Sequence, residues 1–411
     1  MPFRHNAFRW FALSRVFSVV GNQMVSVAVG WQVYELTDSP LALGLVGLVQ
    51  VAPILGLALW AGQFADRADR RNIMVGTQLL HGLASLGLAG LAVQAHPSLP
   101  LIYAMLLLKG VAGAFQMPAG QALMPSLVPQ EIFPGAVAWR SLTFELSSIA
   151  GPVLGGFLIH RFGAGPAYLG NAVLSLLAVA MLLRIPARGK AVRTSSPPPG
   201  GLLDGLRFVW SRQVILGSLT LDLFAVLFAG ATALYPVFAR DILHVGPQGL
   251  GLLKGASSLG SVGMSIWLLN CPPIRRAGRL LLLTVAAYGL FMIGFGLSTW
   301  FWLSMAFLAA AGAADAVSVL IRHTVVLTRT PDAMRGKVSA VNGVFFRSSN
   351  ELGEMESGIA ASLVGAGPSV VLGSLATLGV VGFCAWRFPE LRRLGRLDEM
   401  PPSESGRTLT G

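Results

Sequence analysis

Charged residues are scarce in this sequence. They make up 12% of its 411 residues, against about 25% in a typical soluble domain. Hydrophobic residues account for 54%, which is more apolar surface than a water-soluble fold could bury. The composition argues against a soluble globular enzyme and indicates that lipid surrounds much of the chain.

Cysteine and known catalytic motifs are also scarce. The two cysteines, Cys271 and Cys384, lie far apart in apolar stretches, which argues against a disulfide framework or a cysteine-rich metal site. The chain has no phosphate-binding G-x-x-x-x-G-K-[ST] motif, no H-E-x-x-H and no G-x-S-x-G. We therefore expect no ATP motor, no metal and no cofactor, and an ion gradient as the energy source.

Long apolar runs are abundant. A hydrocarbon core of about 30 Å requires about 20 apolar residues in a helix. The runs predict an all-α polytopic membrane protein with twelve transmembrane helices, near residues 10–34, 41–64, 73–95, 99–123, 135–160, 166–184, 213–239, 247–270, 280–298, 301–327, 337–365 and 368–387.

One connection between these runs is much longer than the others. It contains Pro197-Pro198-Pro199-Gly200-Gly201 and several basic residues, which is typical of a linker. We therefore expect four segments, namely an N-terminal six-helix bundle (1–184), a cytoplasmic linker (185–212), a C-terminal six-helix bundle (213–388) and a cytoplasmic tail (389–411).

The basic residues are distributed unevenly between the two sides of the predicted membrane. Twenty-two Lys and Arg lie in the termini, the linker and the loops on one side, and only Arg161 and Arg240 lie on the other. The positive-inside rule then places both termini and the linker in the cytoplasm. The net charge of +12 is explained by this topology, so we expect no nucleic-acid partner.

The two halves of the chain resemble each other. Arg67 and Arg70, after the second predicted span, correspond to Arg276 and Arg279 after the eighth, with an offset of 209 residues. Gly135 and Gly336, before the fifth and eleventh spans, are offset by 201. Both offsets are close to half the chain, which indicates two six-helix pseudo-repeats.

Several motifs resemble those of the major facilitator superfamily. The stretch from Gly62 to Arg71 is similar to the loop signature G-x-x-x-D-R-x-G-R-R, with Asp69 in place of the usual glycine. The stretch from Gly151 to Gly156 resembles the G-P-x-x-G-G element of that superfamily's antiporters. Residues 222–224, 235–241 and 350–358 resemble the branch of transmembrane secretion effectors that contains the enterobactin exporter.

This resemblance implies a major facilitator fold and transport by alternating access. It also implies roles for two sets of residues. A cytoplasmic gate is expected to form while the cytoplasmic ends of the two halves are together, at Gly62, Asp66, Arg67, Arg70, Arg71, Arg276 and Arg279. A bent, closely packed seam is expected on the fifth span, at Gly151, Pro152, Gly155 and Gly156.

Ionisable residues inside predicted spans are the strongest functional signal, because each costs roughly 2.5–3.5 kcal/mol to insert. Arg347, Glu351 and Glu354 share one helix face, at i, i+4 and i+7. Two carboxyl groups in one stripe compete for ionisation, so one of them is expected to hold a proton. The candidates for proton coupling or substrate binding are Glu351, Glu354, Asp222, Glu145, Arg347 and Glu356.

The expected function is secondary active transport in the cytoplasmic membrane. We favour a monomeric, proton-coupled exporter of a small organic molecule, siderophore-like or drug-like. An importer or a lysophospholipid flippase of the same fold remains an alternative. So do a membrane-embedded acyltransferase, although the histidines form no convincing cluster, and a transport-dead sensor.

Overall fold

The computed structural model describes residues 2–186, 201–272 and 274–395, except for some helical side chains that include Asp66 and Arg347. The long helices are α1 (Asn6–Thr37), α2 (Pro40–Arg67), α3 (Arg70–Ala92), α4 (Leu99–Leu123), α5 (Phe133–Phe162), α6 (Ala164–Leu183), α8 (Gln213–Ala229), α10 (Gly246–Leu268), α11 (Ala277–Leu297), α12 (Phe301–Arg329), α13 (Asp332–Val364) and α14 (Ala366–Arg387). The short elements are α7 (Gly201–Ser211), α9 (Tyr235–Val237), α15 (Pro389–Arg392), the π-helical turn η5 (Phe238–Ile242) and the 3-10 turns η1 (Pro2–Arg4), η2 (Met124–Leu127), η3 (Gln130–Ile132) and η4 (Thr232–Leu234).

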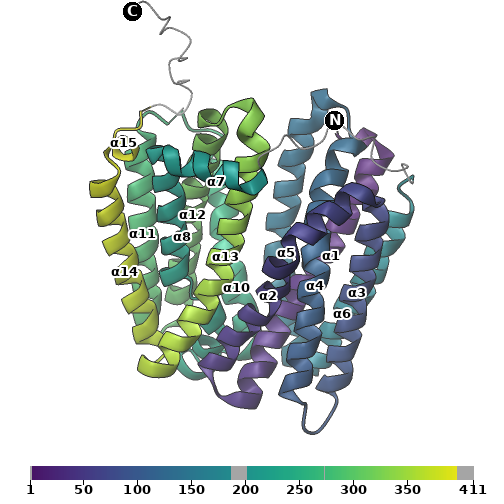
Figure 1. The fold of residues 1–411 in the computed structure, drawn as a ribbon. Helices are drawn as coiled ribbons and strands as arrows, with labels where there is room; N and C mark the ends of the chain where they lie inside the picture. The colour runs from purple at the N-terminus through teal and green to yellow at the C-terminus, as the bar shows by residue number, and fades with distance from the viewer. Residues whose placement is uncertain (1, 187–200, 273, 396–411) are drawn as a thin grey trace, which may run out of the picture.

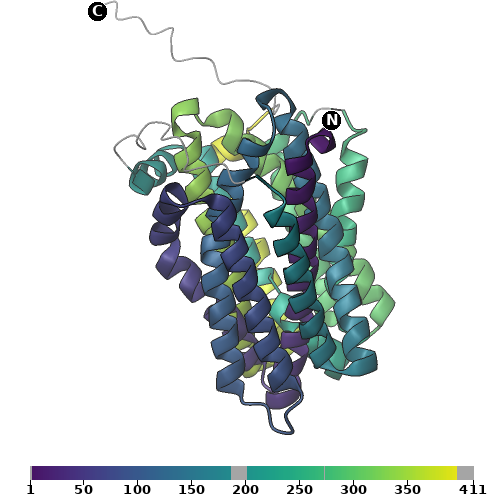
Figure 2. The ribbon, with the colours of Figure 1, turned by 90° about the vertical axis from the view of Figure 1, so that its right-hand side faces the viewer.

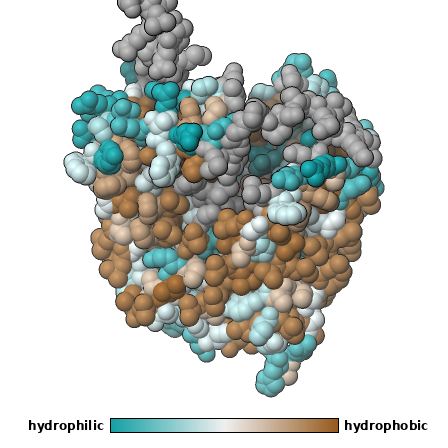
Figure 3. Space-filling view, viewed as in Figure 1, coloured by the Kyte–Doolittle hydropathy of each residue, from teal (hydrophilic) through white to brown (hydrophobic). Residues whose placement is uncertain are grey.

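Ten helices in the described part of the chain are long and apolar enough to cross a membrane. The glycine-rich α10 and the charged α13 complete the arrangement, and both fall on spans that the sequence predicts. Figure 3 shows a broad apolar band across the face in view, with polar residues at both ends, as expected of a protein surrounded by lipid.

The helices form two groups that lie side by side, α1–α6 and α8–α14 (Figure 1). Figure 2 shows that the long helices run along a common direction. The start of α1 and the end of α14 lie at the same end of the bundle, which we call the terminal end. The other end is called the opposite end.

The packing of one group repeats in the other. In the first group α1 packs on α5 and α6, and α4 on α2 and α3. In the second group α8 packs on α13 and α14, and α12 on α10 and α11. The turns that end α5 and α13 also match, because each is made by a glycine with positive φ, Gly163 and Gly365, 202 residues apart. These repeats support a duplicated six-helix unit.

Two helix pairs join the groups, α5 with α10 and α2 with α13. In the first pair, a Cβ on Gly156 would lie 3.0 Å from Gly251 Cα, so the two backbones touch. Gly151 and Gly155 face α1 instead, where a Cβ on Gly155 would lie 3.0 Å from Met24 Cα. The G-P-x-x-G-G element is therefore a packing surface on two sides of α5.

The seventh predicted span is not one continuous helix. Its helix α8 stops at Gly230, and η4, α9 and η5 follow in place of regular α-helix. Gly230 and Pro236 favour the interruption, since glycine is a poor helix former and proline cannot donate a backbone hydrogen bond. Ser357 Oγ on α13 donates to the carbonyl oxygen of Gly230 at 2.9 Å, which satisfies a group left unpaired by the break.

Part of the predicted linker is helical. Residues 187–200 lie outside the described range, but α7 packs against α13 and α8. Lys337 Nζ on α13 donates to Asp204 Oδ2 at 2.9 Å, and Val209 is buried beside Val338 and Val341. The apolar residues of α7 thus bind this segment to the second group, although the proline-rich sequence before it indicated only a linker.

We predict that Gly251→Val destabilises the fold, because a side chain there collides with the backbone of Pro152 and Gly156. The expected loss is about 1–3 kcal/mol of unfolding free energy, measured by unfolding in detergent. Gly263→Val on the same helix is the control, since a Cβ there meets nothing within 4 Å. Equal stability of the two variants would contradict the tight seam.

Candidate functional site

A cavity of about 280 Å³ lies between the two groups of helices. The first group contributes polar side chains that include Asn22, Ser26, Gln50, His81, Lys109 and Gln116. The second contributes Thr232, Pro236, Lys254, Glu351 and Glu354, so the break in the seventh span forms part of the wall. We call this cavity between the two groups the central cavity. Interrupted helices that face a polar cavity are typical of substrate sites in transporters.

Glu351 and Glu354 are thus brought together on the α13 wall, where α2 approaches closely. A Cβ on Gly47 of α2 would lie 2.7 Å from Glu354 Oε2 and 3.3 Å from Glu351 Oε2. Lys254 on α10 is near enough to Glu354 for the two charges to attract. Its Nζ donates to Ser26 Oγ of the first group at 2.8 Å. Lys254 therefore connects the acidic groups of α13 with the first group of helices.

Glu145 lies in a second cavity of about 310 Å³, lined by α1, α4 and α5. Arg15 and Arg140 line it too, and it shares Gly113 and Gln116 with the central cavity. Glu145 is also near enough to Asp315 on α12 for their carboxylates to repel each other. It does not line the same cavity as Glu351 and Glu354.

Asp222 lies in a third cavity, of about 180 Å³, inside the second group. It forms a buried ion pair with Arg322 of α12, whose other guanidinium nitrogen lies 3.8 Å from Asp315 Oδ1. The sequence analysis did not single out Arg322. The available signal was its spacing, because Asp315 and Arg322 are seven residues apart and share a helix face.

The remaining predicted coupling residues have other positions. Glu356 is half-buried and lines none of these three cavities. Arg347 lies on α13, but its side chain is outside the described part of the structure. Within the described residues, no cluster of three or more His, Cys, Asp or Glu side chains could hold a metal ion.

The loop signature makes its described contacts within the first group. Arg70 Nη1 donates to the carbonyl of Ala122 at 2.9 Å, and Arg71 Nε to that of Leu182 at 3.0 Å. These acceptors lie at the C-terminal ends of α4 and α6, where cations are favoured. Asp69 caps α3, because its Oδ1 accepts from the backbone N–H of Arg71 at 2.8 Å.

The other members of the predicted gate are not engaged in a described contact between the halves. Arg67, Arg276 and Arg279 are exposed, and a Cβ on Gly62 would meet nothing within 4 Å. The side chain of Asp66 is outside the described part. In this conformation the signature therefore braces its own group of helices.

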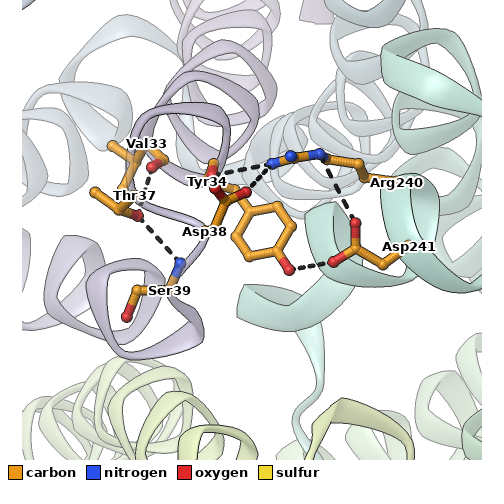
Figure 4. Close-up of polar contacts among 7 residues, drawn as sticks. All are labelled: Val33, Tyr34, Thr37, Asp38, Ser39, Arg240 and Asp241. Atoms are coloured by element: carbon orange, nitrogen blue, oxygen red, sulfur yellow. Dashed lines mark hydrogen bonds and ion pairs between the residues drawn. The ribbon is translucent and has the colours of Figure 1, made fainter.

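A polar network at the opposite end joins the groups, and the sequence analysis did not foresee it (Figure 4). Arg240 Nη1 lies 2.6 Å from Asp38 Oδ1, and Tyr34 Oη donates to the Asp241 carboxylate. The Arg240 guanidinium also lies over the Tyr34 ring, 5.2 Å from its centre. We call Tyr34, Asp38, Arg240 and Asp241 the opposite-end network.

We predict that Arg322→Gln lowers the unfolding free energy by about 3–5 kcal/mol, because it leaves the Asp222 carboxylate buried without its partner. The double variant Asp222→Asn/Arg322→Gln should recover most of the loss. Arg279→Gln, on an exposed position of α11, is the control for removing one positive charge. If the loss of stability in the double variant equalled the sum of the losses in Arg322→Gln and Asp222→Asn, the pair would not be coupled.

Known proteins resemble this chain in sequence and in architecture. The chain matches the family described as transmembrane secretion effector over residues 1–405. It is 31% identical to the enterobactin exporter EntS of Citrobacter koseri and 30% identical to that of Shigella boydii, over 92% of this chain and 89% of each relative.

Solved structures share the fold at low sequence identity. A bacterial homolog of the human lysosomal transporter Spinster, inward-facing and unoccupied, superposes with a TM-score of 0.70 at 15% identity, covering 95% of this chain and 99% of the other. A POT family transporter in complex with 5-aminolevulinic acid has a TM-score of 0.71 at 10% identity, covering 93% and 96%. The major facilitator fold is therefore confirmed, and the chain belongs to the transmembrane secretion effector family of that superfamily of transporters.

Proposed function

We propose that this transporter exports a small organic molecule, siderophore-like or drug-like, in exchange for protons and by alternating access. The observation that carries the proposal is the pair Glu351 and Glu354 on the wall of a cavity between the two groups of helices. Intramembrane carboxylates in such a cavity mark ion or substrate pathways. Membership of a transporter family removes the acyltransferase alternative.

The proposed orientation follows from the charges of the loops. With the Arg-rich terminal end in the cytoplasm, the second cavity leads from that side toward the central cavity. The opposite-end network then closes the outer side. The conformation described corresponds on this proposal to an inward-facing carrier, working as a monomer in the cytoplasmic membrane.

The proposed coupling uses competition for the α13 wall. With the outer side open, a proton from outside binds Glu351 or Glu354 and weakens the attraction of Glu354 for Lys254. With the inner side open, the proton leaves to the cytoplasm and substrate binds. The carboxyl group is thus protonated and Lys254 is freed when the outer side is open, and the proton is lost when the inner side is open. This alternation links proton entry to substrate exit.

Export is favoured over import because the relatives that match nearly the full chain are named as exporters. In the same assay an importer would move its substrate out of the inverted vesicles, and a lysophospholipid flippase would move a lipid. A transport-dead sensor would tolerate neutral replacements of the two glutamates. The experiment below separates these possibilities.

We predict that Glu351→Gln and Glu354→Gln each abolish the pH dependence of flux, because neither amide can take up or release a proton. The measurement is substrate accumulation in inverted membrane vesicles, with a panel of compounds and simultaneous recording of internal pH. Wild-type vesicles should accumulate substrate and release protons from the lumen when substrate is added.

Glu356→Gln is the matched comparison, since it changes the same side-chain type on the same helix outside the three cavities. It should retain coupled flux at equal expression. Normal coupled transport by both Glu351→Gln and Glu354→Gln would refute the assignment of the coupling site.

We also predict that the opposite-end network holds its end closed. Spin labels at Leu41→Cys and Gln248→Cys, both exposed near that end, report its width in a background lacking Cys271 and Cys384. Arg240→Gln should increase the longer-distance population by up to about fivefold, because a partly exposed ion pair contributes about 1 kcal/mol at most.

Asp38→Asn should give a shift no larger than that of Arg240→Gln, because Arg240 also contacts Tyr34 and Asp241. The double variant should match Arg240→Gln, since the ion pair is already lost there. The control is Arg161→Gln, which removes an exposed charge from the end of α5. An unchanged distance distribution in Arg240→Gln would show that other contacts close this end.

A further inference from the structure

Lys109 is a buried lysine whose hydrogen-bond partners are uncharged. It lies on α4, is only 6% exposed and lines the central cavity. Its Nζ donates to Asn22 Oδ1 at 3.0 Å and to Ser85 Oγ at 3.5 Å. Among the described residues, no carboxylate lies within ion-pair distance of this nitrogen. Since a buried charge is costly unless paired, an anion that reached Lys109 would gain from it.

One of the two partners of Lys109 is already engaged elsewhere. Ser85 Oγ also accepts from Asn171 Nδ2 at 2.6 Å, so this hydroxyl is shared between two donors. An ammonium group has three N–H donors, and two are used here. The third remains for a ligand in the cavity.

His81 is a second unfilled polar group on the same wall. It is 5% exposed, and neither ring nitrogen has a hydrogen-bond partner. Gln116 lies beside the imidazole, and its amide nitrogen donates to Gln78 Oε1 at 2.8 Å. A buried polar group without a partner is costly, and a ligand in the cavity would supply one.

The electrostatic character of this wall differs from that of the α13 wall. Lys109 and Arg15 both act electrostatically on His81, so positive charge collects on the first group of helices. Across the cavity, Lys254 is balanced by Glu354. An acidic group entering the cavity is therefore attracted to Lys109 and repelled by the glutamates.

We propose that Lys109 and His81 form a subsite for an acidic group of the transported molecule, a carboxylate or an acidic phenol. The inference rests on the proposed export function and specifies which wall takes the substrate's negative end. The Lys109 ammonium supplies the charge and its third N–H, and His81 hydrogen-bonds a second oxygen. The rest of the molecule extends toward α13.

The test is equilibrium dialysis of the purified full-length protein in detergent with salicylate and with its uncharged analogue salicylamide. Binding requires no membrane gradient, so the result is independent of the coupling experiment. Wild-type protein should bind salicylate about tenfold more tightly than salicylamide, as expected for one charge-assisted contact.

Lys109→Met should reduce this ratio to about one, whereas Lys109→Arg should preserve it because the charge remains. His81→Phe should weaken salicylate binding with little effect on salicylamide. Lys337→Met is the matched control, since it removes an ammonium that contacts Asp204 outside the cavity. It should keep the wild-type ratio.

Three outcomes would overturn the proposal. The first is equal or undetectable binding of the two probes by wild-type protein. The second is an unchanged preference for salicylate in Lys109→Met. The third is displacement of salicylate by millimolar chloride, with gluconate as the inert salt, which would assign the subsite to an inorganic anion.

Discussion

The cost of placing charge within a bilayer governs the arrangement of this molecule. Each ionisable group inside a span must face a cavity or a partner, because hydrocarbon offers neither water nor hydrogen bonds. The chain meets this requirement in two ways. Asp222 and Arg322 neutralise each other inside one group of helices, while Lys109, Lys254, Glu351 and Glu354 line the space between the groups. The first arrangement stabilises one half, and the second makes the contact between the halves responsive to what the cavity holds.

Close backbone contact holds the two groups of helices together around this charged interior. At α5 and α10 the seam is made by Gly156 and Gly251, and at α2 and α13 by Gly44, Gly47 and Gly358. The second seam runs directly beside Glu351 and Glu354, so the same small residues that let α2 approach also fix the distance of the carboxyl groups from the first half. Packing and chemistry are therefore set by the same positions. Because the two seams are related by the internal repeat, motion at one can be matched at the other.

Most of the fold followed from the sequence, because lipid demands long apolar helices and the loops carry the charge asymmetry. Each predicted span contains a long helix, although the seventh is interrupted at Gly230, and residues 201–211 of the predicted linker form a helix. The site was less accessible to sequence reasoning. Spacing along α13 placed Glu351 and Glu354 on one face, but the partnership of Asp222 with Arg322 depends on how α8 meets α12. The opposite-end network joins residues about 200 positions apart, and the role of Asp69 as a helix cap depends on the local backbone.

The π-helical turn η5 makes this segment sensitive to the loss of a single residue. A π-helical turn accommodates one residue more than an α-helical one, and here it carries both Arg240 and Asp241. Within this turn the side chains of both neighbours reach the end of α1, Arg240 at Asp38 and Asp241 at Tyr34. Deleting a single residue from this turn would change the angular phase of the segment while leaving its composition almost intact. Homologous chains that keep these side chains but lose the turn would need a different way to aim them.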